Sequence, residues 1–257
     1  MARGETLSPA RRPLPPPLPP ETRTVGQLVA ETIRVYQHNV WRSLAIGVLP
    51  GVASVVAAEL TGWHRVAFAA AAAPLFTLSY VVAVGIVRDV SVRGRPAITA
   101  FAAGVLVYLP FPLLASLFVL PGLAWFAFLG LVVPVALVEQ LGIRASFSRA
   151  VQLARVDYVH VLGGLCTLAI LVVLTQGVAF YLLRSFADTA GRTGGAVAGI
   201  VLQPLLFLGA AMLYGDQAAR LVSPRRRPRR SDADLSDADD AHGEGRADAQ
   251  LQPGAPS

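Results

Sequence analysis

The feature that most constrains this chain is a series of long stretches without a charged residue. The longest runs from Pro96 to Val138, 43 residues, and residues 24–220 contain only 12 Arg and 7 acidic residues. About 20 apolar residues cross a bilayer as a helix, because backbone groups in hydrocarbon must be hydrogen-bonded within their own segment. The sequence therefore excludes an ordinary soluble domain and predicts an all-α polytopic membrane protein.

The uncharged runs divide into six expected transmembrane helices. The longest run is too long for one span, and Pro121-Gly122 is the strongest turn signal near its middle. Division at that turn gives three hairpins and places both ends of the chain on the same side of the membrane. The expected helices cover residues 43–58, 66–87, 98–119, 122–138, 161–183 and 195–215.

Amphipathic segments are expected before the hairpins. In residues 24–42, Thr24 and Gln27 have the spacing of a capping box, and apolar residues recur at helical period. After a turn at Leu141-Gly142, the chain again alternates an apolar stripe with a stripe that carries Arg. Residues 88–97 are a shorter counterpart, so we expect three helix-plus-hairpin units with interfacial helices on one face.

Both ends of the chain differ in composition from the 24–220 membrane domain. Seven prolines lie between Pro9 and Pro20, so residues 1–23 are expected to be a disordered arm, either a spacer or a ligand for a proline-binding domain. Residues 221–257 carry a basic block followed by an acidic block, which predicts a disordered tail. The basic block is either a stop-transfer anchor or an attraction for anionic lipid.

The distribution of Arg predicts the orientation. All 22 basic residues are Arg, and with six spans 19 of them fall on the side of the termini, against Arg65, Arg184 and Arg192 on the other side. The positive-inside rule then places both termini in the cytoplasm, in a bacterial cytoplasmic (inner) membrane. The partners expected are the lipid bilayer, its anionic headgroups and a partner protein; no nucleic acid is expected.

A search for catalytic sets finds none. The four histidines lie far apart in the sequence, and there is no Gly-rich phosphate loop and no nucleophile elbow. Glu59 and Glu139 are expected at opposite depths of the membrane, and a single cysteine, Cys166, excludes an internal disulfide. We therefore predict no catalytic residue, no cofactor and no metal.

Two amides lie deep within the expected spans. Gln176 is in the fifth span, and Gln203, followed by Pro204, is close to the middle of the sixth. A Pro-kinked helix can line a substrate site in transporters, and it can equally be packed against its neighbours. Each amide is therefore a candidate either for an interhelical hydrogen bond or for binding a solute.

Four charged residues are expected at the cytoplasmic ends of the helices. Glu139, Arg149, Asp216 and Arg220 are candidate structural or interfacial residues. Because a partly desolvated charge needs a counter-ion, we expect at least one acid to pair with Arg149 or with a neighbouring Arg.

The stretch that begins at Pro134 has a specific order: a proline, the acid Glu139, a Gly turn and a helix with Ser146 and Arg149. It resembles the inner-membrane family related to the membrane domain of glycerophosphoryl diester phosphodiesterases. The entry at 31–44 and the exit at 213–220 are similar to that family too, so the resemblance covers about residues 24–220. Departures are Gln140 where Gly is usual, Ala150 where Ser is usual and Ala218 where Arg is common.

The family's catalytic barrel is missing, since no segment outside the membrane is long enough to hold it. The resemblance therefore implies a fold and no activity. The leading hypothesis is a membrane scaffold or accessory factor that contacts lipid or a partner protein. The alternative is a small-solute or lipid transporter that uses the Pro-kinked helices around Gln203. An intramembrane enzyme ranks third, and a polar cavity reaching the midplane would favour transport.

Overall fold

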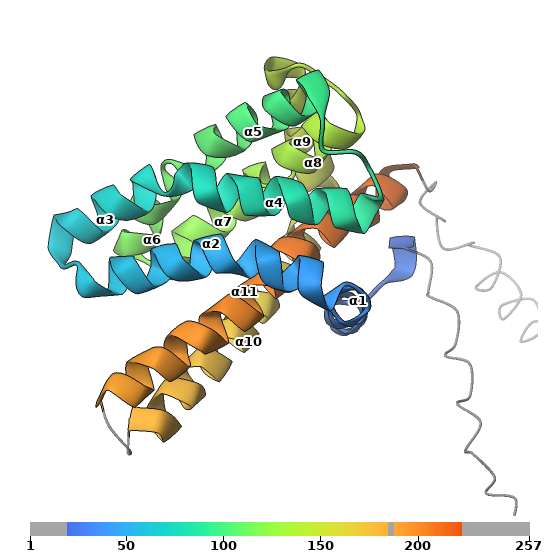
Figure 1. Cartoon of the computed structure of the whole chain (residues 1–257). Helices are drawn as coiled ribbons and strands as arrows, with labels where there is room; N and C mark the ends of the chain where they lie inside the picture. Colours follow the sequence, from blue (N-terminus) through green and yellow to red (C-terminus); the bar gives the residue numbers. More distant parts are fainter. Residues whose placement is uncertain (1–19, 185–187, 223–257) are drawn as a thin grey trace, which may run out of the picture. The chain divides into compact units, whose positions relative to one another are not determined.

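The computed structural model describes residues 20–184 and 188–222, and the regular structure in these ranges is entirely helical (Figure 1). Five helices are long and apolar enough to cross a membrane, or six if the bent pair α3–α4 is counted as one span. The predicted all-α class with several spanning helices is confirmed. The predicted arm and tail lie largely outside the described residues, at 1–19 and 223–257.

The described residues form a series of helices of different lengths. They are η1 (Pro20–Thr22), α1 (Val25–His38), α2 (Val40–Glu59), α3 (Gly62–Ala71), α4 (Ala73–Arg88), α5 (Gly94–Tyr108), α6 (Phe111–Leu117), α7 (Val119–Leu129), α8 (Val132–Val138), α9 (Ile143–Val156), α10 (Tyr158–Arg184) and α11 (Asp188–Val222). The candidate spans are α2, the bent pair α3–α4, residues 94–117, residues 119–138, α10 and most of α11.

Helix α1 is shorter than the sequence predicts. Its capping box is present: the Thr24 backbone N–H donates to Gln27 Oε1 at 2.8 Å, and the Gln27 N–H donates to Thr24 Oγ1 at 3.4 Å. The helix ends at Asn39, whose φ of −122° and ψ of 41° break the helical geometry, and α2 begins at the next residue. The expected single helix over 24–42 is therefore wrong, and Trp41 belongs to the first span.

The turn inside the long uncharged run lies at Phe118, not at Pro121-Gly122. Phe118 is extended, with φ −157° and ψ 148°, and separates α6 from α7. Pro121 is the third residue of α7, where the backbone N–H has no partner within the helix, so a residue without one is tolerated. The predicted pair of helices is present with its boundary moved by a few residues.

The third expected amphipathic segment does not form. After α4, Asp89 takes a left-handed conformation with φ 51°, and its N–H bonds to Gly85 O; residues 90–93 are not helical. Residues 94–97 are already the first turn of α5. Two amphipathic helices, α1 and α9, therefore replace the three that the sequence predicts.

Helix α11 is the centre of the bundle. It contacts α1, α2, α4, α9 and α10, and in Figure 1 it runs alongside α10 and behind α2. Aromatic side chains also join α4, α5, α7 and α11. Tyr80 is fully buried, and the centre of its ring lies 5.7 Å from the centre of the Phe126 ring and 6.3 Å from that of Phe207. Residues that lie far apart in the sequence therefore share one core.

Candidate functional site

Charged side chains from other parts of the chain contact the last turns of α11. Asp216 is completely buried, and its Oδ1 accepts a hydrogen bond from Arg23 Nη1 at 2.7 Å. His160 Nε2, from the first turn of α10, lies 4.0 Å from Asp216 Oδ2. Arg23 directly precedes the N-cap of α1, so this ion pair fixes the start of α1 against α11.

A second ion pair fixes α10 against the same part of α11. Asp157 precedes α10, and its Oδ1 accepts from the backbone N–H of His160 at 3.1 Å, which is the N-cap arrangement. Its other oxygen accepts from Arg220 Nη1, and Arg220 Nη2 donates to the Arg23 carbonyl at 3.0 Å. Arg220 therefore links the N-cap of α10 to Arg23, the residue before the N-cap of α1.

A third group fixes α9. Arg149 Nε lies 3.2 Å from Glu139 Oε2, and Tyr214 Oη donates to Glu139 Oε1 at 3.1 Å. The Arg88 guanidinium lies 5.5 Å from the centre of the Tyr214 ring, within cation–π range. Glu139 thus joins the end of α8 to both α9 and α11.

The predicted charged candidates fall into two groups rather than one. Glu139 pairs with Arg149, which meets the expectation of an acid–Arg pair, while Asp216 and Arg220 find other partners. Sequence reasoning missed Arg23, Asp157 and His160. Asp157 and His160 have the spacing of an N-cap residue and its third helical residue, and this signal was available in the sequence.

We call the segment Tyr214–Arg220, together with its ion-pair partners, the charged end. Several of its buried polar atoms, including both side-chain polar atoms of Gln217 and Asp216 Oδ2, have no hydrogen-bond partner in the described part of the chain. Such groups are costly in hydrocarbon and much less so where headgroups and water reach.

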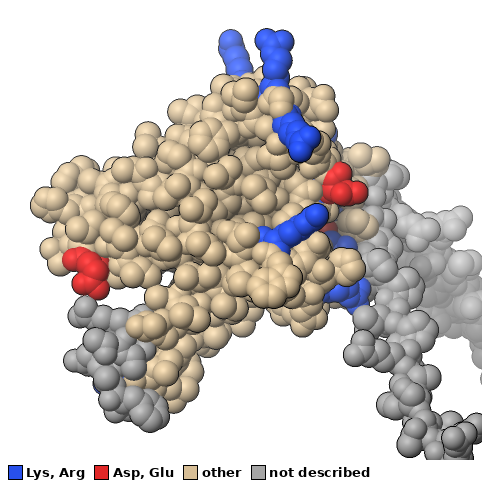
Figure 2. Space-filling view, in the orientation of Figure 1, with Lys and Arg blue, Asp and Glu red and all other residues tan. Residues whose placement is uncertain are grey.

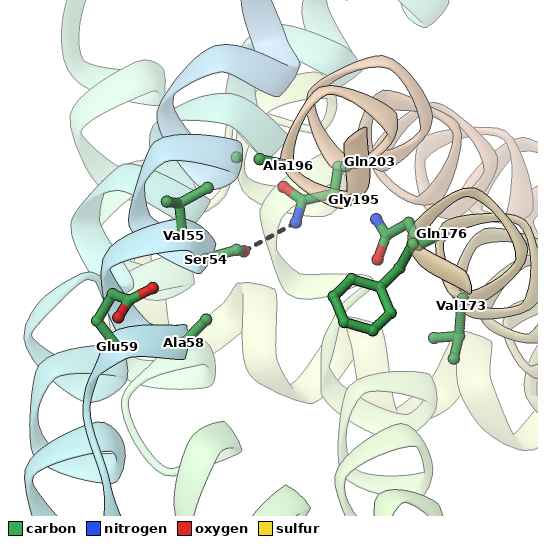
Figure 3. A pocket seen from close by; sticks show the side chains of 13 residues that line it. Ser54, Val55, Ala58, Glu59, Val173, Gln176, Gly195, Ala196 and Gln203 are labelled. Atoms are coloured by element: carbon green, nitrogen blue, oxygen red, sulfur yellow. Dashed lines mark hydrogen bonds between the residues drawn. The ribbon is translucent and has the colours of Figure 1, made fainter. Parts of the chain in front are cut away.

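A crevice of about 550 Å³ lies near the C-terminal end of α2 and is bordered by α2, α10 and α11 (Figure 3). Its polar side chains come from all three helices: Ser54 and Glu59 from α2, Gln176 from α10 and Gln203 from α11. Gln203 lies ten residues beyond the start of the candidate span Thr193–Val222, or about 15 Å along a helix, which is half the thickness of the hydrocarbon core.

Gln203 is hydrogen-bonded between helices, as one of the two predicted roles requires. Its Nε2 donates to Ser54 Oγ at 2.9 Å, while its Oε1 is buried without a partner among the described residues. Figure 3 shows the Gln176 amide extending from α10 toward the same space. The structure thus brings both predicted amides to one crevice.

The described residues contain no group of three His, Cys, Asp or Glu that could hold a metal ion. The charged end offers ion pairs and helix caps, which position helices, and the crevice offers amide and hydroxyl groups, which bind polar groups. No protein-family model, no curated protein and no solved structure matches this chain.

Proposed function

We propose that the chain is a multi-pass membrane scaffold or accessory factor whose interfacial helices contact anionic lipid headgroups. One observation carries the proposal: the two amphipathic helices are both held against the last turns of α11. Helix α1 is held by the Arg23–Asp216 ion pair, and α9 is held through Glu139, which pairs with Arg149 and accepts a hydrogen bond from Tyr214. The exposed Arg144 and Arg155 of α9 are thereby carried on a fixed helix, which lowers the entropic cost of binding.

The exposed side chains at this end favour an anionic partner. In Figure 2 the blue side chains of the visible face lie toward the end that carries α1 and α9, together with one red side chain, and a second red one lies at the opposite end. Trp41 is 83% exposed beside them, as is typical of an aromatic residue at a bilayer interface. The exposed arginines on the predicted cytoplasmic side are Arg42, Arg88, Arg93, Arg95, Arg144 and Arg155.

The proposal includes a bacterial inner-membrane location with both termini in the cytoplasm, because the Arg distribution demands that orientation. It also keeps the likeness to the membrane domain of the phosphodiesterase family. That likeness rests on the residue order alone: a proline, the acid Glu139, a Gly turn and a helix with Ser146 and Arg149.

Lipid retention tests the proposal. The full chain is purified from membranes, and native mass spectrometry compares bound phosphatidylglycerol with bound phosphatidylcholine. We expect the anionic lipid to be retained preferentially. Replacing Arg144 and Arg155, the exposed arginines of α9, by Gln should abolish the preference, because each Arg near a charged surface contributes about 1 kcal/mol.

The matched control replaces Arg65 and Arg184, which lie near the ends of spans on the predicted outer side, by Gln. Equal retention of both lipids by the wild-type chain would contradict the proposal. Recovery of one stoichiometric protein in place of lipid would instead identify a protein-binding face.

A transporter is the second candidate, and the crevice that reaches Gln203 favours it. The test places a cysteine at position 203 in a chain carrying Cys166→Ala and adds a membrane-impermeant thiol reagent to each side. Labelling from both sides indicates alternating access, labelling from one side indicates a static crevice, and complete protection contradicts transport through this residue.

A further inference from the structure

The crevice has a closed end and an open end. Glycines determine the closed end. At the closed end α2 and α11 touch so closely that a Cβ on Gly47 would overlap the Ile200 carbonyl oxygen, and one on Gly51 would overlap the Ile200 side chain. Beyond this contact the helices diverge, and Figure 1 shows the α10–α11 hairpin separating from α2 toward its loop. The volume of about 550 Å³ is that of a small-ligand site.

The polar groups near the closed end form only some of the hydrogen bonds that they can make. Ser54 and Gln203 share one hydrogen bond, which leaves one end of the Gln203 amide unpaired whichever way the amide is turned. The Gln176 side chain makes no hydrogen bond to another described residue. Three neutral groups that both donate and accept therefore meet where three helices converge.

The charge of the lining excludes an anion. None of the described residues that border the crevice is basic, and Glu59 is its one acid. A phosphate or carboxylate brought to the depth of Gln203 would lose its hydration and gain no positive partner from this lining. A ligand that fits this lining is therefore not an anion, and it offers hydroxyl or amide groups to Ser54, Gln176 and Gln203.

The walls are apolar and partly open to the surroundings of the bundle. Val55 on α2 and Val173 and Phe180 on α10 border the crevice, and all three are exposed. Apolar chains that enter between α2 and the α10–α11 hairpin would lie along these side chains. The crevice thus combines a neutral polar end with apolar walls.

We propose that this crevice binds a neutral lipid with free hydroxyl groups, whose polar group contacts Ser54, Gln176 and Gln203. The site is separate from the basic face at the charged end, and binding does not depend on whether the lipid is then carried across the membrane. It deepens the transporter candidate by naming the class of ligand.

Photolabelling tests the proposal. The full chain is placed in phosphatidylcholine nanodiscs with a monoacylglycerol that carries a diazirine on its acyl chain. Labelled peptides are mapped by mass spectrometry with and without excess unlabelled monoacylglycerol. We expect competable labelling of residues 51–59, 173–180 and 195–203, and none by a lysophosphatidic acid with the same chain.

Gly177→Leu is the decisive variant, because Gly177 lines the crevice and a Cβ at this position meets no atom within 4 Å, so that the added side chain has room to start and takes up space in the crevice. Its control is Gly163→Leu on the same helix, where a Cβ is equally free and no crevice is lined. We expect Gly177→Leu to lower competable labelling by about tenfold, as loss of a site with its hydrogen bonds implies, and Gly163→Leu to leave it unchanged.

Gln176→Leu provides a second route that leaves the packing intact, and we expect it to lower the labelling as well. Unchanged labelling in both Gly177→Leu and Gln176→Leu would overturn the proposal. Equal labelling by the phosphate lipid, or labelled peptides outside the crevice, would overturn it too. Because the basic-face variants are measured by retention of phosphatidylglycerol, failure of one site is distinguished from failure of the other.

Discussion

At the scale of single residues, Asp216 of the charged end and Glu139 at the end of α8 differ in burial. The Asp216 side chain is fully buried and its partner Arg23 is 10% exposed, whereas the side chains of Glu139 and Arg149 are 25% and 32% exposed. An exposed ion pair contributes little because water screens it, while a buried charge that loses its partner keeps its full desolvation cost. The two pairs should therefore respond very differently to removal of one partner.

We predict that Arg23→Ala lowers the free energy of unfolding in detergent by about 3 to 5 kcal/mol, the range for breaking a buried pair. Glu139→Ala should also destabilise, by about 1 kcal/mol, since its ion pair is partly exposed. Adding Asp216→Asn to Arg23→Ala removes the orphaned charge and should restore part of the loss. Thermal melts of the wild-type chain and these three variants measure this, and similar losses from Arg23→Ala and Glu139→Ala would contradict it.

At the scale of helices, the approach of α2 to α11 depends on glycine. The Gly47 and Gly51 spacing indicates close packing in the sequence, and the structure places both residues against Ile200 of α11. This contact fixes the closed end of the crevice and thereby the position of Ser54 against Gln203. Packing at the glycines and polar bonding at the amide thus depend on each other.

Gly47→Ala should accordingly destabilise the protein by about 1 to 3 kcal/mol, as overpacking does, because the added methyl group must separate two backbones. Gly163→Ala is the control: a Cβ there has no neighbour within 4 Å, so the change should be neutral or stabilise by up to about 1 kcal/mol through helix propensity. Equal effects of the two changes on chemical unfolding would show that the helices do not touch at Gly47.

Helix positions were more predictable from the sequence than helix ends and charge partners. The absence of charge locates the spans, because hydrocarbon penalises charge along the whole length of a helix. The break at Asn39 and the turn at Phe118 are set by packing and carry no proline or glycine signal at the break. Arg23 and Asp216 lie 193 residues apart, so their pairing follows from the tertiary arrangement alone.

Part of the candidate site was also predictable, because polar residues stand out within apolar runs. Gln176 and Gln203 stand out as amides within apolar runs, and the crevice contains both. Ser54 carries no such signal, because a serine in a spanning helix commonly bonds to its own backbone. Only the arrangement of three helices shows that these side chains share one space.

At the scale of the whole molecule, the number of crossings depends on the bent pair α3–α4. The two helices contain 10 and 16 residues and meet at 43°, so neither alone reaches the length of about 20 residues that a span needs. Tyr80 of α4 is fully buried among rings from α5, α7 and α11, which places α4 inside the bundle. A pair that crosses completely gives six spans, and a re-entrant pair gives five.

Reporter fusions after residues 20, 92 and 222 distinguish these topologies. Six crossings predict a cytoplasmic reporter at all three positions, because the segment after α4 carries Arg88, Arg93 and Arg95 and the positive-inside rule keeps it in the cytoplasm. A fusion within the α2–α3 turn, after Thr61, should be exported and serves as the positive control. If α3–α4 were re-entrant, the fusion at 92 would be exported and the two end fusions would lie on opposite sides of the membrane. That outcome would contradict the 2.7 Å contact between Arg23 and Asp216, which lies between the residue before α1 and the last turns of α11.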